Sequence, residues 1–203
     1  MIIKKTTHIM GNTEMGKTFF ANQEANNLLA NNEKVLYVSV FADLINSNLE
    51  KVFIKEEADI VKIIDKIKNG LSLNIVLPKS QLGDDLKEIY NLFFKNILRN
   101  FDFMSNYYLF IDDAQNLEED FLVTLLSECR KYETKVILIH QYLEQFSDKS
   151  LEYVFDFCEV GIYFKLTKLN TQTILTKFPS GNYTENNFME QEQGAYIVLE
   201  KNN

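Results

Sequence analysis

The sequence predicts an α/β fold in which a mainly parallel sheet carries helices on both faces. Short apolar segments rich in β-favouring residues alternate with longer segments whose apolar residues recur at helical spacing. The connections between these segments are short, and repeated β-α units of this kind join by right-handed crossovers into a parallel sheet. Polar residues follow several of the predicted strands, where ligands bind in such sheets.

The first third of the chain is predicted to contain two strands and two helices. Residues 6–10 form a β-favouring run and residues 19–30 contain no helix breaker, so a strand leads into a helix. The short apolar run 35–40 is the second strand. Isoleucine and valine at helical spacing over 60–67, with an Asn-Gly stop signal soon after, predict the second helix.

The middle of the chain continues the alternation of strands and helices. Residues 73–77 form a short apolar strand that a proline ends, and apolar residues within 86–97 mark one face of a helix. Residues 107–111 are predicted to be a strand, residues 117–132 a helix and residues 136–139 the next strand.

The last quarter of the chain is predicted to contain two further helices and two further strands. Residues 151–158 and 171–178 are the helices, and residues 160–166 and 195–199 are the strands. The polar run 180–193 is predicted to be a mobile connecting loop.

The segment from Gly11 to Thr18 fills every fixed position of the phosphate-binding pattern G-x-x-x-x-G-K-[ST]. It lies between a predicted strand and a predicted helix, which is the context that the pattern requires. Its glycines let the backbone wrap around phosphate oxygens, and the helix N-terminus favours an anion. We therefore expect ATP to bind here, with Lys17 at the β/γ-phosphates and Thr18 at Mg²⁺. The predicted nucleotide site comprises Gly11, Asn12, Thr13, Glu14, Met15, Gly16, Lys17 and Thr18.

Two predicted strands end in residues suited to phosphoryl transfer. Asp112 and Asp113 follow the strand 107–111. Asp112 is the candidate Mg²⁺ ligand, and Asp113 is expected to accept a proton from the attacking water or to orient that water. Gln141 follows the strand 136–139, where it is expected to contact the γ-phosphate or the water. Its neighbour His140 is interpreted as a structural hydrogen-bond partner, as is His8.

Arg130 is the candidate for an arginine that stabilises the transition state. The chain has only two arginines, Arg99 and Arg130. Arg130 lies near the end of a predicted helix, where the helix dipole alone favours a cation. An arginine supplied by a neighbouring subunit can accelerate phosphoryl transfer, and Arg130 is the first choice for this catalytic role.

Length, composition and net charge limit the class of protein to which the chain can belong. The 203 residues are 46% hydrophobic and are expected to form a single domain, residues 1–203. No apolar run is long enough to span a membrane and no signal peptide is recognisable, so a cytoplasmic protein is expected. Cys129 and Cys158 are interpreted as core thiols. The net charge of -8 argues against a protein that coats itself non-specifically with nucleic acid, so any DNA contact must be local.

Three segments resemble the motor domain of the HerA/FtsK superfamily, and within it the conjugative coupling proteins of type IV secretion. Residues 109–117, 126–132 and 137–146 resemble that family's D-E-x-Q-N, S-E-x-R-K-Y and x-H-Q-Y-x-x-Q segments. Residues 161–166 and 195–199 look like the family's closing strands.

The resemblance implies a RecA-like P-loop fold and a ring-forming, usually hexameric ATPase that pumps double-stranded DNA through its channel. By position, Lys17 and Thr18 match the family's nucleotide loop, Asp112 its magnesium acid, Gln141 its sensor and Arg130 its trans-acting finger. Asp113 departs from the family, which usually has Glu there, and slower hydrolysis or a backbone shift is implied.

The chain is expected to lack the membrane anchor and helical insertion of coupling proteins. It therefore also resembles the genome-packaging ATPases of membrane-containing viruses, and capsid or secretion-channel proteins are the implied partners.

Three functions remain open from the sequence. The leading one is a DNA-translocating ATPase that packages a viral genome or transfers a mobile element. A non-motor ATP-binding switch is the second, because Asp113 in place of Glu is compatible with slow turnover. A small P-loop kinase is the third, although such kinases generally close an arginine-bearing lid and this chain has few arginines.

Overall fold

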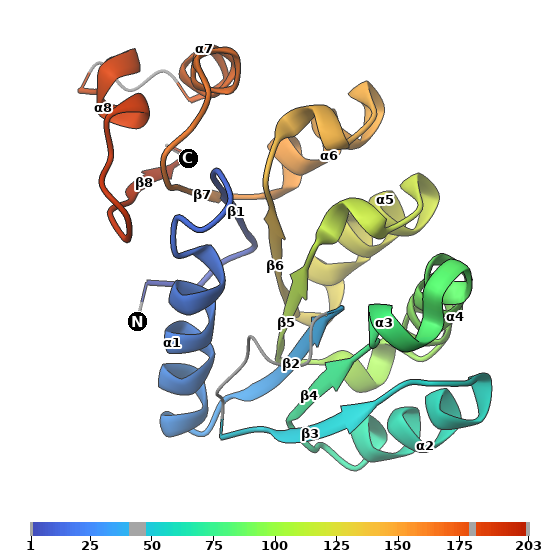
Figure 1. Cartoon of the computed structure of the whole chain (residues 1–203). Coiled ribbons are helices and arrows are strands. Elements are labelled where there is room, and N and C mark those ends of the chain that lie inside the picture. The colour runs from blue at the N-terminus through green and yellow to red at the C-terminus, as the bar shows by residue number, and fades with distance from the viewer. Residues whose placement is uncertain (1, 41–47, 179–181, 202–203) are drawn as a thin grey trace.

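The computed structural model in Figure 1 describes residues 2–40, 48–178 and 182–201. They form an eight-stranded sheet in the order β3-β4-β2-β5-β6-β1-β7-β8. β8 pairs antiparallel with β7, and all the other strand pairs of the described sheet are parallel. The strands are β1 (Thr7–Met10), β2 (Lys34–Ser39), β3 (Glu50–Phe53), β4 (Leu73–Val76), β5 (Tyr107–Asp112), β6 (Lys135–His140), β7 (Val160–Tyr163) and β8 (Ile197–Glu200).

Helices cover both faces of the sheet, as predicted (Figure 1). α1 packs on one face, while α2, α4, α5 and α6 pack on the other. α7 and α8 lie beyond them, next to β7 and β8. The helices are α1 (Lys17–Ala30), α2 (Glu57–Lys68), α3 (Lys79–Leu82), α4 (Leu86–Arg99), α5 (Glu119–Glu128), α6 (Asp148–Phe157), α7 (Lys168–Lys177) and α8 (Glu185–Met189).

Side chains alternate between two cores along each central strand. In β2, Leu36 and Val38 join the core under α2, α4 and α5, whereas Val35 and Tyr37 join the core under α1. This alternation follows from the two-residue repeat of a strand. A strand buried on both faces therefore reads as a continuous apolar run, which explains why the central strands were predictable from the sequence.

The parallel arrangement brings the ends of three strands together. β6 lies between β1 and β5, with Met10 paired to His140 and Asp112 paired to Ile139. The segments that follow these strands therefore leave the same edge of the sheet. The phosphate-binding pattern follows β1, the two aspartates lie at the end of β5, and Gln141 follows β6.

Some elements differ from the prediction. β3 and the one-turn helix α3 were missed, and the helix predicted over 117–132 is α5 followed by a 3-10 turn, Cys129–Tyr132. The run 180–193 is not a plain loop, because it contains α8. α8 forms because Thr184 and Asn187 make a capping box and Phe188 is fully buried. Ser180 and Gly181 lie outside the described residues.

Two further sequence predictions concern the burial of the cysteines and the length of apolar helices. Cys129 and Cys158 are buried free thiols, as predicted. Over residues 2–40, 48–178 and 182–201, the structure contains no helix with the length and apolar character needed to cross a bilayer.

Candidate functional site

The phosphate-binding loop connects β1 to α1, and its path depends on two glycines. Gly16 has φ 100° and ψ 6°, a left-handed conformation that other residues disfavour, and α1 begins directly after it. Gly11 is required for a different reason, because a Cβ atom there would lie 2.5 Å from the Cβ of Phe164. The loop therefore packs closely against the segment that follows β7.

Lys17 supplies a buried positive charge to the loop. It is 8% exposed, and its Nζ donates a hydrogen bond to the carbonyl oxygen of Asn12 at 2.8 Å. Burial lowers the pKa of Lys17, and the charges of Asp112 and Asp113 partly oppose this shift. No side chain of the described residues caps the start of α1, which leaves its first N–H groups available to an anion.

Asp112, the last residue of β5, faces the loop and is held by three donors. Its Oδ2 accepts hydrogen bonds from the hydroxyls of Thr18 at 3.3 Å and Tyr37 at 3.4 Å. Its Oδ1 accepts one from the backbone N–H of Asp113 at 3.1 Å. Burial raises the pKa of Asp112 to about 6, and the negative charge of Asp113 adds to this increase.

The oxygen atoms of Thr18 and Asp112 fit a magnesium ion. Mg²⁺ prefers carboxylate and hydroxyl oxygens, and it is usually held by one or two such protein groups together with phosphate oxygens. A divalent cation would also offset the cost of a charged carboxylate in this buried position.

Asp113 begins the turn after β5 in a left-handed conformation, with φ 54° and ψ 47°. Aspartate adopts this conformation more readily than most residues. The side chain of Gln115 donates a hydrogen bond from Nε2 to Oδ1 of Asp113 at 3.1 Å. The Asp113 carboxylate is thus held in one orientation by a residue of its own motif.

Gln141 follows β6, the strand that lies between β1 with its loop and β5 with its aspartates. Its Oε1 accepts a hydrogen bond from the Thr13 hydroxyl at 3.2 Å. Oε1 of Gln145 accepts hydrogen bonds from the backbone N–H groups of Gln141 and Tyr142, both at 3.0 Å. The second glutamine of the segment 137–146 therefore fixes the backbone that presents the first.

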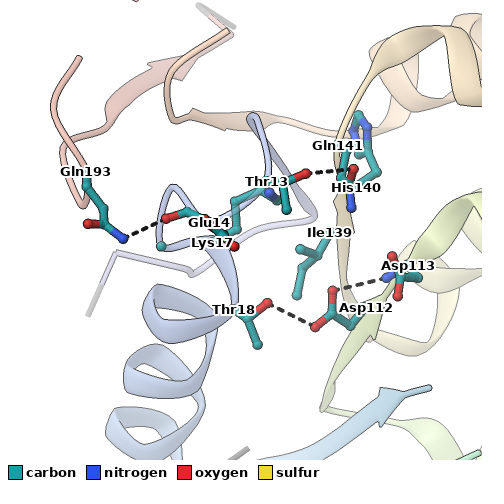
Figure 2. A pocket seen from close by; sticks show the side chains of 11 residues that line it. Thr13, Glu14, Lys17, Thr18, Asp112, Asp113, Ile139, His140, Gln141 and Gln193 are labelled. Atoms are coloured by element: carbon teal, nitrogen blue, oxygen red, sulfur yellow. Dashed lines mark hydrogen bonds between the residues drawn. The ribbon is translucent and has the colours of Figure 1, made fainter. Parts of the chain in front are cut away.

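These groups surround one pocket of about 520 Å³, shown in Figure 2. Gln193 reaches it from the C-terminal segment, with its Nε2 donating to the carbonyl oxygen of Glu14 at 2.9 Å. Gly11, Asn12 and Met15 shape the loop without lining the pocket. The lining residues are Thr13, Glu14, Gly16, Lys17, Thr18, Asp112, Asp113, Ile139, His140, Gln141 and Gln193.

Arg130 lies in the turn that leads from α5 into β6. It is therefore at the amino-terminal ends of the strands, whereas the pocket lies at their carboxyl-terminal ends. Its guanidinium group is 5.4 Å from the ring centre of Phe157 and 4.0 Å from Oε1 of Glu159. It lines a separate hollow of about 240 Å³, together with residues that directly precede β1, β6 and β7. The chain therefore does not bring Arg130 to the pocket that contains its own phosphate-binding loop.

The two histidines are both buried, but their contacts differ. His8 Nε2 lies 2.6 Å from the hydroxyl of Tyr163, as predicted for a structural hydrogen-bond partner. The ring of His140 packs edge-on against Phe146 and interacts with the backbone of Tyr142, and its role as a structural hydrogen-bond partner stays a prediction. Burial lowers the pKa of His140 to about 3, so the residue beside Gln141 is neutral at pH 7.

Sequence reasoning missed four residues of the site. Gln115 and Gln145 lie inside the motif segments, so their position was a signal that was not used. Tyr37 and Gln193 had no such signal, because they contact residues 75 and 179 positions away in the sequence.

Comparison with solved structures places the chain among known folds. The genome packaging NTPase B204 from Sulfolobus turreted icosahedral virus 2, in complex with AMP, is 12% identical with a TM-score of 0.66, covering 97% of this chain and 92% of that one. VirB4 of Thermoanaerobacter pseudethanolicus is 9% identical with a TM-score of 0.70, covering 98% and 89%. The bacterial conjugative coupling protein TrwBdeltaN70 is 10% identical with a TM-score of 0.74, covering 98% and 82%.

These similarities confirm the predicted α/β fold, which the chain shares with a genome packaging NTPase, VirB4 and a conjugative coupling protein. The B204 NTPase has also been solved in complex with AMPPCP and with ATP-gammaS. No protein-family model matches the sequence, and no curated protein matches it.

Proposed function

We propose that the chain is an ATP-hydrolysing motor that translocates double-stranded DNA. The observation that carries this proposal is the convergence of the phosphate loop with Asp112, Asp113 and Gln141 on one pocket. The fold, which is similar to that of a genome packaging NTPase and a conjugative coupling protein, supports DNA as the substrate. Viral genome packaging and transfer of a mobile element are both compatible with it.

The site residues have distinct roles in this proposal. Lys17 and the N–H groups of the loop bind the β- and γ-phosphates. Thr18 and Asp112 hold Mg²⁺, which neutralises charge on the phosphate oxygens when bound. Asp113 takes a proton from the attacking water, and Gln141 orients that water or contacts the γ-phosphate.

The proposal includes a ring, hexameric by resemblance, in which each subunit completes its neighbour's site. Arg130 is 56% exposed in its side chain and lies at the edge of the sheet opposite to its own pocket. A finger in this position can act only on another subunit's nucleotide. We place such a motor in the cytoplasm of a host cell, as a single domain that works with capsid or secretion-channel proteins.

ATP turnover measured against protein concentration and added DNA tests this function. Turnover should rise steeply with both, because assembly on the duplex completes the shared sites. ATP-driven displacement of a third strand from a triplex on linear DNA then measures movement directly. A monomer whose turnover responds to neither protein concentration nor DNA would exclude the motor.

A nucleotide switch that turns over slowly is the second candidate. The hydrogen bond from Gln115 to Asp113 favours it, because a short carboxylate held by an amide is less available to water. Rapid mixing of ATP with excess protein distinguishes the two functions. The switch retains intact ATP over many minutes even with DNA present, whereas the motor hydrolyses it.

A further inference from the structure

A hollow of about 310 Å³ lies between α1 and the beginning of β8. Phe20, Gln23 and Asn27 of α1 line one side, Tyr196 lines another, and Ile2 closes it from the N-terminal segment. None of these side chains takes part in the chemistry described above.

The position of this hollow relative to the phosphate loop indicates a ligand. Asp112, Asp113 and Gln141 follow strands on one side of β1, so the phosphate that is attacked must point to that side. The remainder of the nucleotide must then extend to the other side of β1, where β7 and β8 lie. Tyr196 directly precedes β8, on that side.

The C-terminal segment connects the hollow firmly to the loop. The backbone N–H of Gly194 donates to the carbonyl oxygen of Met15 at 3.1 Å, next to the contact between Gln193 and Glu14. A Cβ atom on Gly16 would lie 3.4 Å from the Cα of Gly194. Tyr196 therefore has a fixed place beside the first turn of α1.

The hollow combines an aromatic face with polar groups. The Tyr196 ring packs 4.8 Å from the ring of Phe20 and 5.6 Å from the ring of Phe164, yet Tyr196 remains 39% exposed. Glu24, which is 5% exposed, accepts hydrogen bonds from the backbone N–H of Ile3 and from the Asn27 amide. Amide side chains can both donate and accept, which suits the polar edge of a nucleobase.

We propose that this hollow receives the base of the nucleotide whose phosphates bind the loop, with the base stacked on Tyr196 and its polar edge facing Gln23. Aromatic side chains stack on bases of any sequence, because every base has a π-face. The proposal rests on the proposed function only in requiring that the loop binds a nucleoside triphosphate.

The chain contains no tryptophan, so Tyr196→Trp introduces a single reporter at the proposed contact. Its fluorescence should fall when Mg-ATP is added and should stay constant with inorganic tripolyphosphate, which has no base. Tyr183→Trp is the matched control, since Tyr183 is 37% exposed, also packs against a phenylalanine and lies in the segment before α8. Equal responses at both positions would overturn the proposal.

Affinity measurements distinguish the contribution of the base to binding from that of the phosphates. Tyr196→Ala should weaken ATP binding about tenfold, the range expected for loss of one stacked base, and should leave tripolyphosphate binding unchanged. Tyr196→Phe should retain the wild-type affinity, and a melting curve checks that both variants fold. If the wild type binds ATP no more tightly than tripolyphosphate, the base site is wrong and the phosphate loop stands. If it binds neither, the proposed function itself fails.

Discussion

The carboxyl ends and the amino ends of the central strands surround two hollows of opposite charge. We call these two sides of the sheet the carboxyl edge and the amino edge. At the carboxyl edge, three carboxylates, Glu14, Asp112 and Asp113, accompany a single lysine, Lys17, in the candidate nucleotide pocket. At the amino edge, Arg130 shares its hollow with three lysines and two glutamates, although the chain as a whole has a net charge of -8. The three lysines are Lys4, Lys5 and Lys135.

This difference indicates how copies of the chain could assemble. Contact between unlike surfaces generates a ring when the rotation closes. In the proposed ring, the cationic amino edge of one subunit would complement the acidic carboxyl edge of the next, because complementary potentials favour the correct register. We therefore expect substitutions at the carboxyl edge to affect an isolated subunit, and substitutions at the amino edge to affect only the assembly.

The largest effect is expected at the carboxyl edge, for Lys17→Ala. ATP turnover should be abolished because the β/γ-phosphates lose their charge partner. Turnover and nucleotide affinity measured together check this prediction. Lys168→Ala, which removes an exposed lysine of α7, is the control and should behave like the wild type. Unchanged turnover in Lys17→Ala would remove the phosphate-loop assignment.

At the amino edge, Arg130→Ala should lower turnover by about 10³- to 10⁵-fold, the range for arginine fingers, while ATP affinity is retained. Arg99→Ala is the matched control, because it removes the only other arginine from an exposed position. Loss of ATP affinity in Arg130→Ala would contradict a role in trans.

Mixing Lys17→Ala protein with Arg130→Ala protein tests whether the two edges form one shared site. Where a Lys17→Ala subunit presents its intact Arg130 to the intact loop of an Arg130→Ala subunit, one complete site forms. Partial recovery of turnover in the mixture is expected. If the mixture is as inactive as its components, the two edges do not share a site.

Asp113→Asn should reduce turnover by about 10²- to 10⁴-fold with ATP binding retained, because the amide keeps the shape but cannot take a proton. Asp113→Glu is the sharper test. The extra methylene displaces the carboxylate from Gln115, and a misplacement of this size can cost about 10²-fold. A rate equal to or above that of the wild type would instead show that Asp113 is only a shortened glutamate.

The order of the elements and the main site residues were predictable because their signals are local. Apolar periodicity marks the buried strands, and the phosphate pattern lies in consecutive residues. β3 was missed because it is an edge strand, with Glu50, Lys51 and Phe53 exposed and no apolar run. α8 was missed because one buried residue, Phe188, anchors an otherwise polar segment.

Contacts across the fold were not predictable in the same way. Tyr37 belongs to a strand that the sequence identified, but its hydrogen bond to Asp112 depends on β2 and β5 being neighbours. Likewise, the sequence predicts that Arg130 lies near the end of a helix. It does not predict that lysines surround Arg130, because these lysines come together only when the amino ends of β1, β6 and β7 lie side by side.

The smallest effect is expected for Lys5→Ala, a charge at the margin of the amino edge. Lys5 Nζ lies 3.9 Å from both Glu159 and Glu200, with 38% of its side chain exposed, so it contributes little to the stability of the subunit. A charge in such a place mainly affects association and its dependence on salt. The protein concentration that gives half-maximal turnover should rise a few-fold, while the maximal rate and the melting temperature stay constant.

Lys62→Ala, on the exposed face of α2, is the control. If Lys5→Ala lowers the maximal rate at saturating protein, Lys5 acts within the site, and the distinction between a catalytic carboxyl edge and an assembling amino edge fails at that residue.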